Sequence, residues 1–199
     1  MRNTKSWMIL LGLWLLLLLL GCRSLGKVSQ GRVIDYEPGK GLVTLIQDSN
    51  YREPGKPNYD VLPPVTVRIP ENSKAMGPAP QAGKLMLLDT RSRKVVIFDA
   101  ASQSFRTITY TLIEQRDNVT SGDARIAGVR FPVVDRKKKT ITAYSARQRR
   151  LLTFSVPGEY LTLPDDTWVA GDEVRYYYKD PHQALRLMNV TRTDISRGG

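Results

Sequence analysis

The chain has 199 residues, which is enough for one ordinary domain or two small ones. It contains one cysteine and one histidine, and this excludes an intrachain disulfide, a histidine-based catalytic triad and a multi-histidine metal site. The formal net charge of +11 favours anionic lipid head groups, acidic glycans or an acidic protein as partners, with a charge that serves only solubility as the alternative.

The N-terminus has the order of a secretory signal: basic Arg2 and Lys5, an apolar run over residues 7–20, and then the small residue Gly21. A transmembrane helix is the alternative interpretation. A helix that spans the bilayer needs about 20 apolar residues, and this run is shorter. We therefore predict a cleaved signal peptide over residues 1–21.

The end of that run, Leu19-Leu20-Gly21-Cys22, resembles the lipobox of bacterial lipoproteins, in which an aliphatic and a small residue precede a cysteine. The resemblance implies cleavage between Gly21 and Cys22 and attachment of palmitate-type acyl chains to Cys22, with residues 22–30 as the acylated tether. Arg23 stands where an aspartate would signal inner-membrane retention. By the same analogy the protein is lipid-anchored in the bacterial cell envelope, at the outer membrane and facing the periplasm.

Beyond Cys22, apolar and polar residues alternate as they do in half-buried strands. The pattern is clear over residues 65–69, 107–112, 152–156 and 174–178. No apolar stripe of helical spacing persists over three turns. The sequence therefore predicts an all-β fold.

The strand-like segments also suggest an internal repeat, because two sets of five such segments follow in the same order with similar spacing. We predict two tandem β units, the first over residues 31–115 with an inserted loop over 50–64, and the second over residues 128–195. A polar linker over residues 116–127 would join them. The first set comprises residues 31–36, 42–46, 65–70, 82–88 and 95–99, and the second comprises 130–135, 140–144, 152–157, 170–178 and 184–190.

Five strands of this order fit a small, partly open Greek-key barrel. The second unit resembles periplasmic OB-fold-like proteins through Val133 to Asp135, Ile141-Thr142, Phe154-Ser155-Val156-Pro157 and the segment from Trp168 to Tyr176. The predicted fold is therefore two tandem OB-like, partly open barrels after a cleaved N-terminal signal segment. The whole chain is also similar to a family of bacterial lipoproteins catalogued as a domain of unknown function, and this resemblance implies no mechanism.

Catalytic chemistry has little support in the sequence. His182 lies in a turn, Asp180-Pro181-His182, and a metal site formed with Met188 would lack a third soft ligand. Adjacent Asp165 and Asp166 would point to opposite faces of a strand. Nucleophile-elbow, phosphate-loop and Rossmann motifs are missing from the sequence. We predict no catalytic residue, no metal and no cofactor, with an unrecognised hydrolase as the remaining enzymatic alternative.

Two basic turns and an aromatic loop contain the candidate contact residues. We predict that the two turns lie near one another and form one concentrated basic patch, with a pair of merely solvated turns as the alternative. Our first hypothesis is a non-enzymatic interaction or assembly module that binds an envelope protein. The alternative is an OB-like carrier for an anionic glycan, lipid or oligonucleotide, although nucleic acid is disfavoured as a partner in the envelope. The candidates are Arg136, Lys137, Lys138 and Lys139 in one turn, Arg147, Arg149 and Arg150 in the next, and Tyr51 and Tyr59 in the inserted loop.

Overall fold

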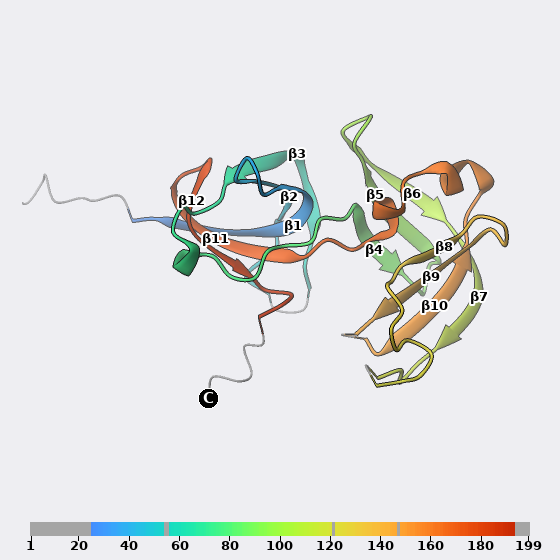
Figure 1. Cartoon of the computed structure of the whole chain (residues 1–199). Coiled ribbons are helices and arrows are strands. Elements are labelled where there is room, and N and C mark those ends of the chain that lie inside the picture. The colour runs from blue at the N-terminus through green and yellow to red at the C-terminus, as the bar shows by residue number, and fades with distance from the viewer. Residues whose placement is uncertain (1–24, 54–55, 121, 147, 194–199) are drawn as a thin grey trace, which may run out of the picture.

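The computed structural model describes residues 25–53, 56–120, 122–146 and 148–193, so the predicted signal peptide and Cys22 lie outside the described residues. This part of the chain contains twelve β-strands and three short 3-10 helices (Figure 1). The predicted all-β class is confirmed. None of the helices in the described residues is long and apolar enough to span a membrane.

Five strands form a closed barrel in the order β1-β11-β12-β3-β2. All neighbours are antiparallel except β12 and β3, which run parallel and meet at a single residue pair, Gln183 with Arg68. Alternate side chains of these strands fill the barrel, because successive residues of a strand point to opposite faces. The strands are β1 (Lys27–Glu37), β2 (Leu42–Asp48), β3 (Tyr59–Arg68), β11 (Glu173–Asp180) and β12 (Gln183–Asn189).

The residues between β3 and β11 build a second unit from two sheets, with the strand orders β4-β5-β6 and β7-β10-β9-β8. Only Tyr110 separates β6 from β7, so the chain passes directly from one sheet into the other. The sheets share one core, which the last two 3-10 helices help to close. The elements of this unit are β4 (Leu85–Asp89), β5 (Lys94–Asp99), β6 (Ser104–Thr109), β7 (Thr111–Arg116), β8 (Val133–Asp135), β9 (Thr140–Ser145), β10 (Arg150–Ser155), η2 (Gly158–Thr162) and η3 (Asp165–Trp168). The remaining short helix, η1 (Ser73–Ala75), lies against β12 of the barrel.

The strand pairing differs from the predicted tandem units over residues 31–115 and 128–195. The N-terminal strands β1, β2 and β3 pair with β11 and β12 from the other end of the chain, and the second unit is inserted between them. The alternating pattern identifies which residues face a core, but it does not say which strand is the neighbour. For this reason the pattern predicted the positions of most strands correctly, but the prediction of which strands form one unit was wrong.

The prediction that residues 116–127 link two separate units is also wrong, because β7 before the segment and β8 after it belong to the same sheet. Most of the segment is exposed, but Arg116 still belongs to β7, and Val119 is completely buried. The Val119 amide donates to the carbonyl oxygen of Arg149 at 2.8 Å, and the Tyr144 hydroxyl donates to the Val119 carbonyl oxygen at 3.1 Å. This segment is therefore packed against β9 and the turn that follows it.

The two connections between the units lie side by side as an antiparallel pair, with Lys84 opposite Ala170. Two short motifs look repeated in the sequence, namely Ala82-Gly83 and Ala170-Gly171. They are in fact the two connecting segments of one crossover, the first leading from the barrel to the second unit and the other leading back. A Cβ atom on Gly171 would lie 1.9 Å from the Val33 carbonyl oxygen, so only glycine permits this close backbone approach. The buried Asp172 carboxylate accepts hydrogen bonds from the Gln81 amide at 2.8 Å and from Asn189 Nδ2 at 2.9 Å.

A different internal repeat is present within the second unit. The run β4-β5-β6 and the run β8-β9-β10 have turns of equal length, so that Asp89, Lys94 and Ser104 correspond to Asp135, Thr140 and Arg150 at one constant offset. Corresponding turn residues also share the left-handed backbone, with φ of 55° at Arg93 and 57° at Lys139, and of 49° at Gln103 and 50° at Arg149. This repeat is hard to recognise in the amino-acid sequence, because the matching positions share turn geometry and burial more than residue type.

The two units pack against each other through a small apolar cluster. Ile34 and Ile46 of the barrel contact Met86 and Phe98 of the second unit. Arg32 crosses the same boundary, because its Nη1 donates to the carbonyl oxygens of Leu85 at 3.0 Å and Met86 at 2.7 Å. The cluster and these bonds hold one face of the second unit on the barrel.

Candidate binding cleft between the barrel and the second unit

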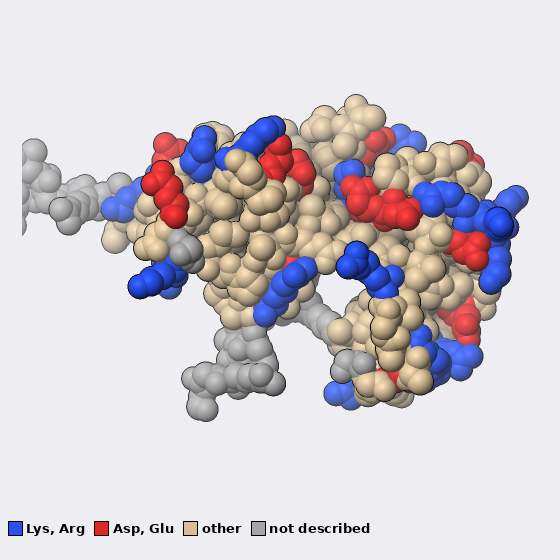
Figure 2. Space-filling model, in the orientation of Figure 1, with Lys and Arg blue, Asp and Glu red and all other residues tan. Residues whose placement is uncertain are grey.

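A cleft of about 800 Å³ lies where the barrel meets the second unit. In Figure 2 the surface is hollowed between the two halves of the molecule, and Lys or Arg side chains border the hollow. The barrel side contributes residues from β1, from the β2–β3 loop, from the start of β3 and from both crossover strands. The second unit contributes residues from β4, β9, β10 and η3.

The lining combines positive charge with apolar and aromatic surface. Its cations are Arg32, Lys56 and Arg150, and no Asp or Glu belongs to it among the described residues. A surface of this kind attracts anionic groups and also buries flat or extended apolar ones. The remaining lining residues are Pro57, Tyr59, Gln81, Leu85, Met86, Leu87, Leu88, Thr90, Phe131, Pro132, Ala143, Tyr144, Ser145, Gln148, Leu152, Trp168, Val169 and Ala170.

Two strand edges border the cleft on the side of the second unit. β4 is an edge strand that pairs only with β5, and its residues from Leu85 to Leu88 all belong to the lining. β9 extends past its short neighbour β8, which pairs only with residues 140–142, and Ala143, Tyr144 and Ser145 also line the cleft. The cleft therefore follows the opening between the two sheets of a partly open unit.

On the barrel side, Tyr59 is held in a network of charged and polar side chains. The Arg32 guanidinium lies 4.3 Å from the centre of the Tyr59 ring, and the Tyr59 hydroxyl donates to Glu173 Oε2 at 2.9 Å. Burial raises the pKa of the Tyr59 hydroxyl well above its usual range, and the neighbouring Glu173 carboxylate adds to the rise. Tyr59 was predicted as a residue of an exposed loop, whereas it is the first residue of β3 and is fixed in place.

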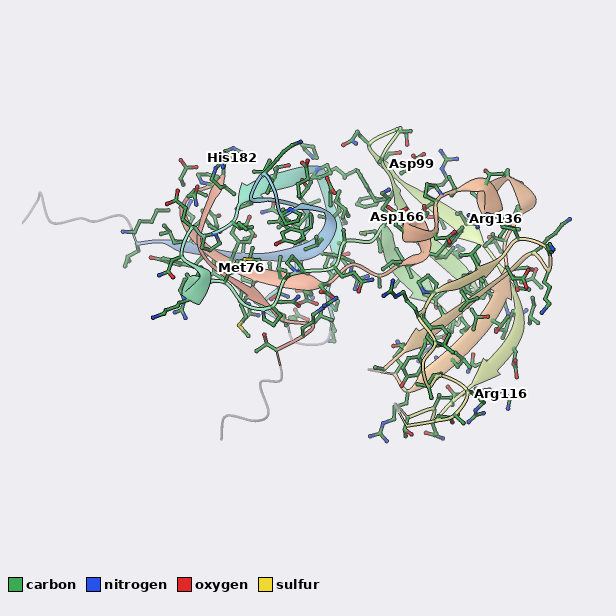
Figure 3. All side chains as sticks on the ribbon, viewed as in Figure 1. Met76, Asp99, Arg116, Arg136, Asp166 and His182 are labelled. Atoms are coloured by element: carbon green, nitrogen blue, oxygen red, sulfur yellow. The ribbon has the colours of Figure 1, made fainter. Side chains whose placement is uncertain are left out.

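The first predicted basic turn, Arg136 to Lys139, connects β8 and β9 and does not line the cleft (Figure 3). The Arg136 guanidinium donates to the Leu161 and Leu163 carbonyl oxygens, both at 3.2 Å, and to Asp165 Oδ1 at 2.7 Å. Lys138 lies 3.7 Å from the Asp135 carboxylate, and Lys137 and Lys139 are exposed.

The second basic turn lies between β9 and β10, at the opposite end of β9 from the first. Six residues of strand separate the two turns, and this corresponds to about 20 Å at the rise per residue of a strand. The sequence prediction that the two turns form one concentrated patch is therefore wrong, because consecutive hairpins of a meander place their turns at alternate ends of the sheet.

Of the predicted basic residues of the second turn that the structure describes, Arg150 lines the cleft, and Gln148 of the same turn lines it as well. Arg150 Nε donates to Asp117 Oδ1 at 2.5 Å and its Nη1 to the Thr90 hydroxyl at 3.2 Å. Arg149 is exposed and lies outside the lining, and Arg147 lies outside the described residues. Tyr51 stays in the β2–β3 loop beside Arg52, away from the lining, while Gly21 and Cys22 also lie outside the described residues.

Arg32, Trp168 and the β4 edge were not recognised from the sequence. Trp168 is 2% exposed, and its Nε1 has no hydrogen-bond acceptor among the described protein atoms. The one available signal was the continuous apolar run from Leu85 to Leu88, since alternation would be expected of a strand with one solvated face. No group of three His, Cys, Asp or Glu side chains in the described part of the chain is placed to hold a metal ion.

Fold and cleft together define an all-β protein in which a second β unit, with an internal repeat, is inserted into a five-stranded barrel and forms a basic, aromatic cleft with it. The chain belongs to the family described as Domain of unknown function (DUF4881), whose family model matches residues 24–198. No match was found among curated proteins or among solved structures.

Proposed function

We propose that the protein is a membrane-anchored envelope lipoprotein that acts without catalysis as an interaction or assembly module, and that it holds a protein partner in the cleft. The observation that carries this proposal is the lining itself, where three cations and the apolar edge strand β4 meet without a carboxylate among the described residues. The Thr90 and Ser145 hydroxyls have no histidine or carboxylate beside them in that lining to act as a base. This supports binding rather than hydrolysis.

The barrel supports an OB-like relationship and, with it, the alternative of a carrier for an anionic glycan, lipid or oligonucleotide. A closed five-stranded barrel with a single parallel contact between β3 and the last strand is consistent with an OB-fold, and such folds bind ligands through the face of strands 2 and 3 and the adjoining loops. Here the β1–β2 and β11–β12 loops are short, and the second unit adds a larger cleft elsewhere. We therefore assign the partner to the cleft.

The position of β1 supports a tether that leaves the cleft accessible. β1 begins at Lys27, shortly after Cys22, and in Figure 1 this end of the strand lies on the side of the barrel away from the second unit. An anchor at Cys22 would therefore attach the barrel to the membrane and leave the second unit pointing away from it.

The anchor is tested by replacing Cys22 with serine. Without the thiol that receives the lipid, we expect an uncleaved precursor with no acyl mass, whereas the wild-type protein should lack residues 1–21 and carry acyl chains. Intact-protein mass spectrometry of membrane fractions measures both. A wild-type protein that keeps residues 1–21 and carries no acyl chain would contradict the lipoprotein proposal.

The cleft is tested by placing a photo-activated crosslinking residue at Leu87 or at Ile113. Both are apolar strand residues of similar exposure, 54% and 55%, but only Leu87 lines the cleft. We expect irradiated cells to yield one discrete protein adduct from position 87, identified by mass spectrometry, and none from position 113. Equal labelling at the two positions, or no protein adduct at 87, would contradict the proposal.

A further inference from the structure

We infer that the partner enters the cleft as an extended acidic segment that adds a β-strand to the free edge of β4. This inference rests on the proposed function and specifies the partner chemistry for the same site. It depends on three features of the cleft, which are the available edge of β4, the apolar wall beside it and the charge of the lining.

In the described part of the chain, the hydrogen bonds on the cleft side of β4 lie at its start, and at its end the Tyr110 hydroxyl donates to the Asp89 carbonyl oxygen at 3.3 Å. The other edge pairs with β5 from Leu85 to Asp89. On the cleft side, the Leu85 amide donates to the Val169 carbonyl oxygen at 3.0 Å, and Arg32 reaches the carbonyl oxygens of Leu85 and Met86. No other described strand pairs with β4, so the backbone after Met86 offers an edge to an incoming chain.

The returning crossover indicates the direction in which such a strand would run. Ala170 lies antiparallel to Lys84 immediately before β4 begins. An added antiparallel strand would therefore lie in line with the crossover segment and follow β4 beyond Met86, over its last three residues, a length of about 10 Å. The end of β9 borders the other side of the same opening, so the added strand would fill the gap of a partly open unit.

The side-chain chemistry of the cleft matches a segment that alternates apolar and acidic residues. Successive side chains of a strand point to opposite faces, so one set can contact the exposed Leu87 while the other remains near the polar boundary of the cleft. At that boundary, Lys56 is 79% exposed and lies 3.8 Å from Glu53, while Arg150 is 27% exposed and forms an ion pair with Asp117. The Lys56 ammonium is therefore the cation that carboxylates of the added strand can reach.

The apolar wall favours a peptide over a polyanionic carbohydrate or nucleic acid. Leu87 is 54% exposed and Leu88 is half-buried, whereas Leu85 and Met86 are buried in the two cores on either side of β4. A peptide strand can contact the exposed aliphatic side chain and also pair with the β4 backbone. A highly charged glycan would leave this surface without an apolar partner. Binding of such a polyanion is therefore an outcome that the experiment must be able to detect.

The test uses the full-length chain in detergent micelles and short peptides of alternating valine and glutamate. We expect the Val–Glu peptide to bind and to slow amide hydrogen exchange in β4, but not in the edge strand β7. A Val–Lys peptide and a Val–Glu peptide N-methylated on alternate backbone amides should each bind at least about tenfold more weakly, because the first reverses the charge and the second removes the hydrogen-bond donors on one edge. Affinity is measured by isothermal titration.

Lys56→Glu and Lys40→Glu form a matched pair of variants. Each lysine lies in a barrel loop and has a glutamate three residues earlier as its ion-pair partner, but only Lys56 lines the cleft. We expect Lys56→Glu to weaken binding of the Val–Glu peptide by roughly threefold to tenfold at low salt, and Lys40→Glu to leave it unchanged.

Three results would overturn the inference. The first is tight binding of the N-methylated peptide, which would mean that charge alone holds it. The second is equal weakening of peptide binding by the Lys40 and Lys56 variants. The third is displacement of the peptide by heparin without slowed hydrogen exchange in β4, as expected of a polyanion carrier.

If position 87 yields a protein adduct in cells and no Val–Glu peptide slows hydrogen exchange in β4, the strand-addition inference fails and the proposed function stands. If position 87 yields no adduct, the proposed function itself fails.

Discussion

Gly171 shows how one residue without a side chain decides where the second unit leaves the barrel. The returning crossover touches β1 at this point, and Val33 exchanges backbone hydrogen bonds with both crossover passages, donating to the Asp172 carbonyl oxygen and accepting from the Gly83 amide. A side chain at position 171 would push the crossover away from these bonds. The buried Asp172 carboxylate next to it, paired with Arg192, would lose its alignment as well.

We therefore expect Gly171→Ala to lower the free energy of unfolding by on the order of 3 kcal/mol or more, since the clash is with backbone and cannot be relieved by a rotamer change. Urea denaturation followed by circular dichroism measures the effect. Gly158→Ala is the matched control, because a Cβ atom there meets nothing within 4 Å. Equal destabilisation by both variants would show that the close approach at Gly171 is not required.

The aspartates of the turns predict the response to acid. The Ser92 hydroxyl lowers the pKa of Asp89, the Ser102 hydroxyl that of Asp99, and the backbone amide of Lys138 that of Asp135. The Arg125 guanidinium lowers the pKa of Asp123 to about 2.

Because these pKa values are lower in the folded protein than the usual aspartate value of 3.8, the carboxylates stabilise the fold above about pH 4, and this contribution is lost as the pH falls towards about 2. We expect the free energy of unfolding to decrease between pH 5 and pH 2.5, and Asp123→Asn to reduce the steepness of that decrease. Urea denaturation at a series of pH values measures both. A free energy of unfolding that stays constant over this range would contradict the assignment.

At the scale of elements, the second unit is built from hairpins of one design. The turns in each run of three strands have equal length and end at a residue with a left-handed backbone. The side chain of a polar residue at the start of the turn accepts a hydrogen bond from a backbone amide: Asp89 from Ser92, Asp135 from Lys138, and Ser145 from Gln148. The left-handed positions hold arginine, glutamine and lysine rather than glycine. These turns therefore contain backbone strain that another residue could relieve.

Lys139→Gly should raise the free energy of unfolding by about 0.5–1 kcal/mol, because glycine adopts positive φ without the steric cost that a side chain carries. Arg93→Gly should have a similar effect, since the two turns are equivalent. Lys138→Gly, one position earlier and without positive φ, is the control and should not stabilise the protein. Thermal denaturation measures all three, and a Lys139→Gly variant that is no more stable than Lys138→Gly would contradict the equivalence of the turns.

At the scale of the whole molecule, the barrel joins the two ends of the described chain. β1, β2 and β3 pair with β11 and β12, which follow the second unit in the sequence. The apolar cluster of Ile34, Ile46, Met86 and Phe98 then fixes the second unit on the barrel. The cleft exists only because both units are held in this relation.

This topology predicts the behaviour of a nicked chain. We expect a specific protease site introduced next to Gly122 to yield two fragments that elute together in size-exclusion chromatography, because β1, β2 and β3 remain paired with β11 and β12 across the cut. The fragments should separate only in denaturant. Two halves that separate and stay folded without denaturant would be the behaviour of tandem independent units, and would contradict the inserted arrangement.

The sequence by itself determined the all-β class and the position of most strands, because the alternation of apolar and polar residues is a local property of a half-buried strand. Residues 65–69, 152–156 and 174–178 fall largely in β3, β10 and β11, and residues 107–112 span the passage from β6 to β7. The signal peptide and the acylation of Cys22 also come from sequence alone and stay predictions.

Only the tertiary structure decided which strands are neighbours and which functional side chains meet. Strand pairing joins residues far apart in the chain, and any two strands with one apolar face satisfy the same pattern. For that reason the predicted tandem units and the predicted basic patch were wrong, although their strands and turns exist. Arg32, Tyr59, Arg150 and Trp168 come from four separate segments, and they line one cleft because the second unit folds back onto the barrel through paired crossover strands.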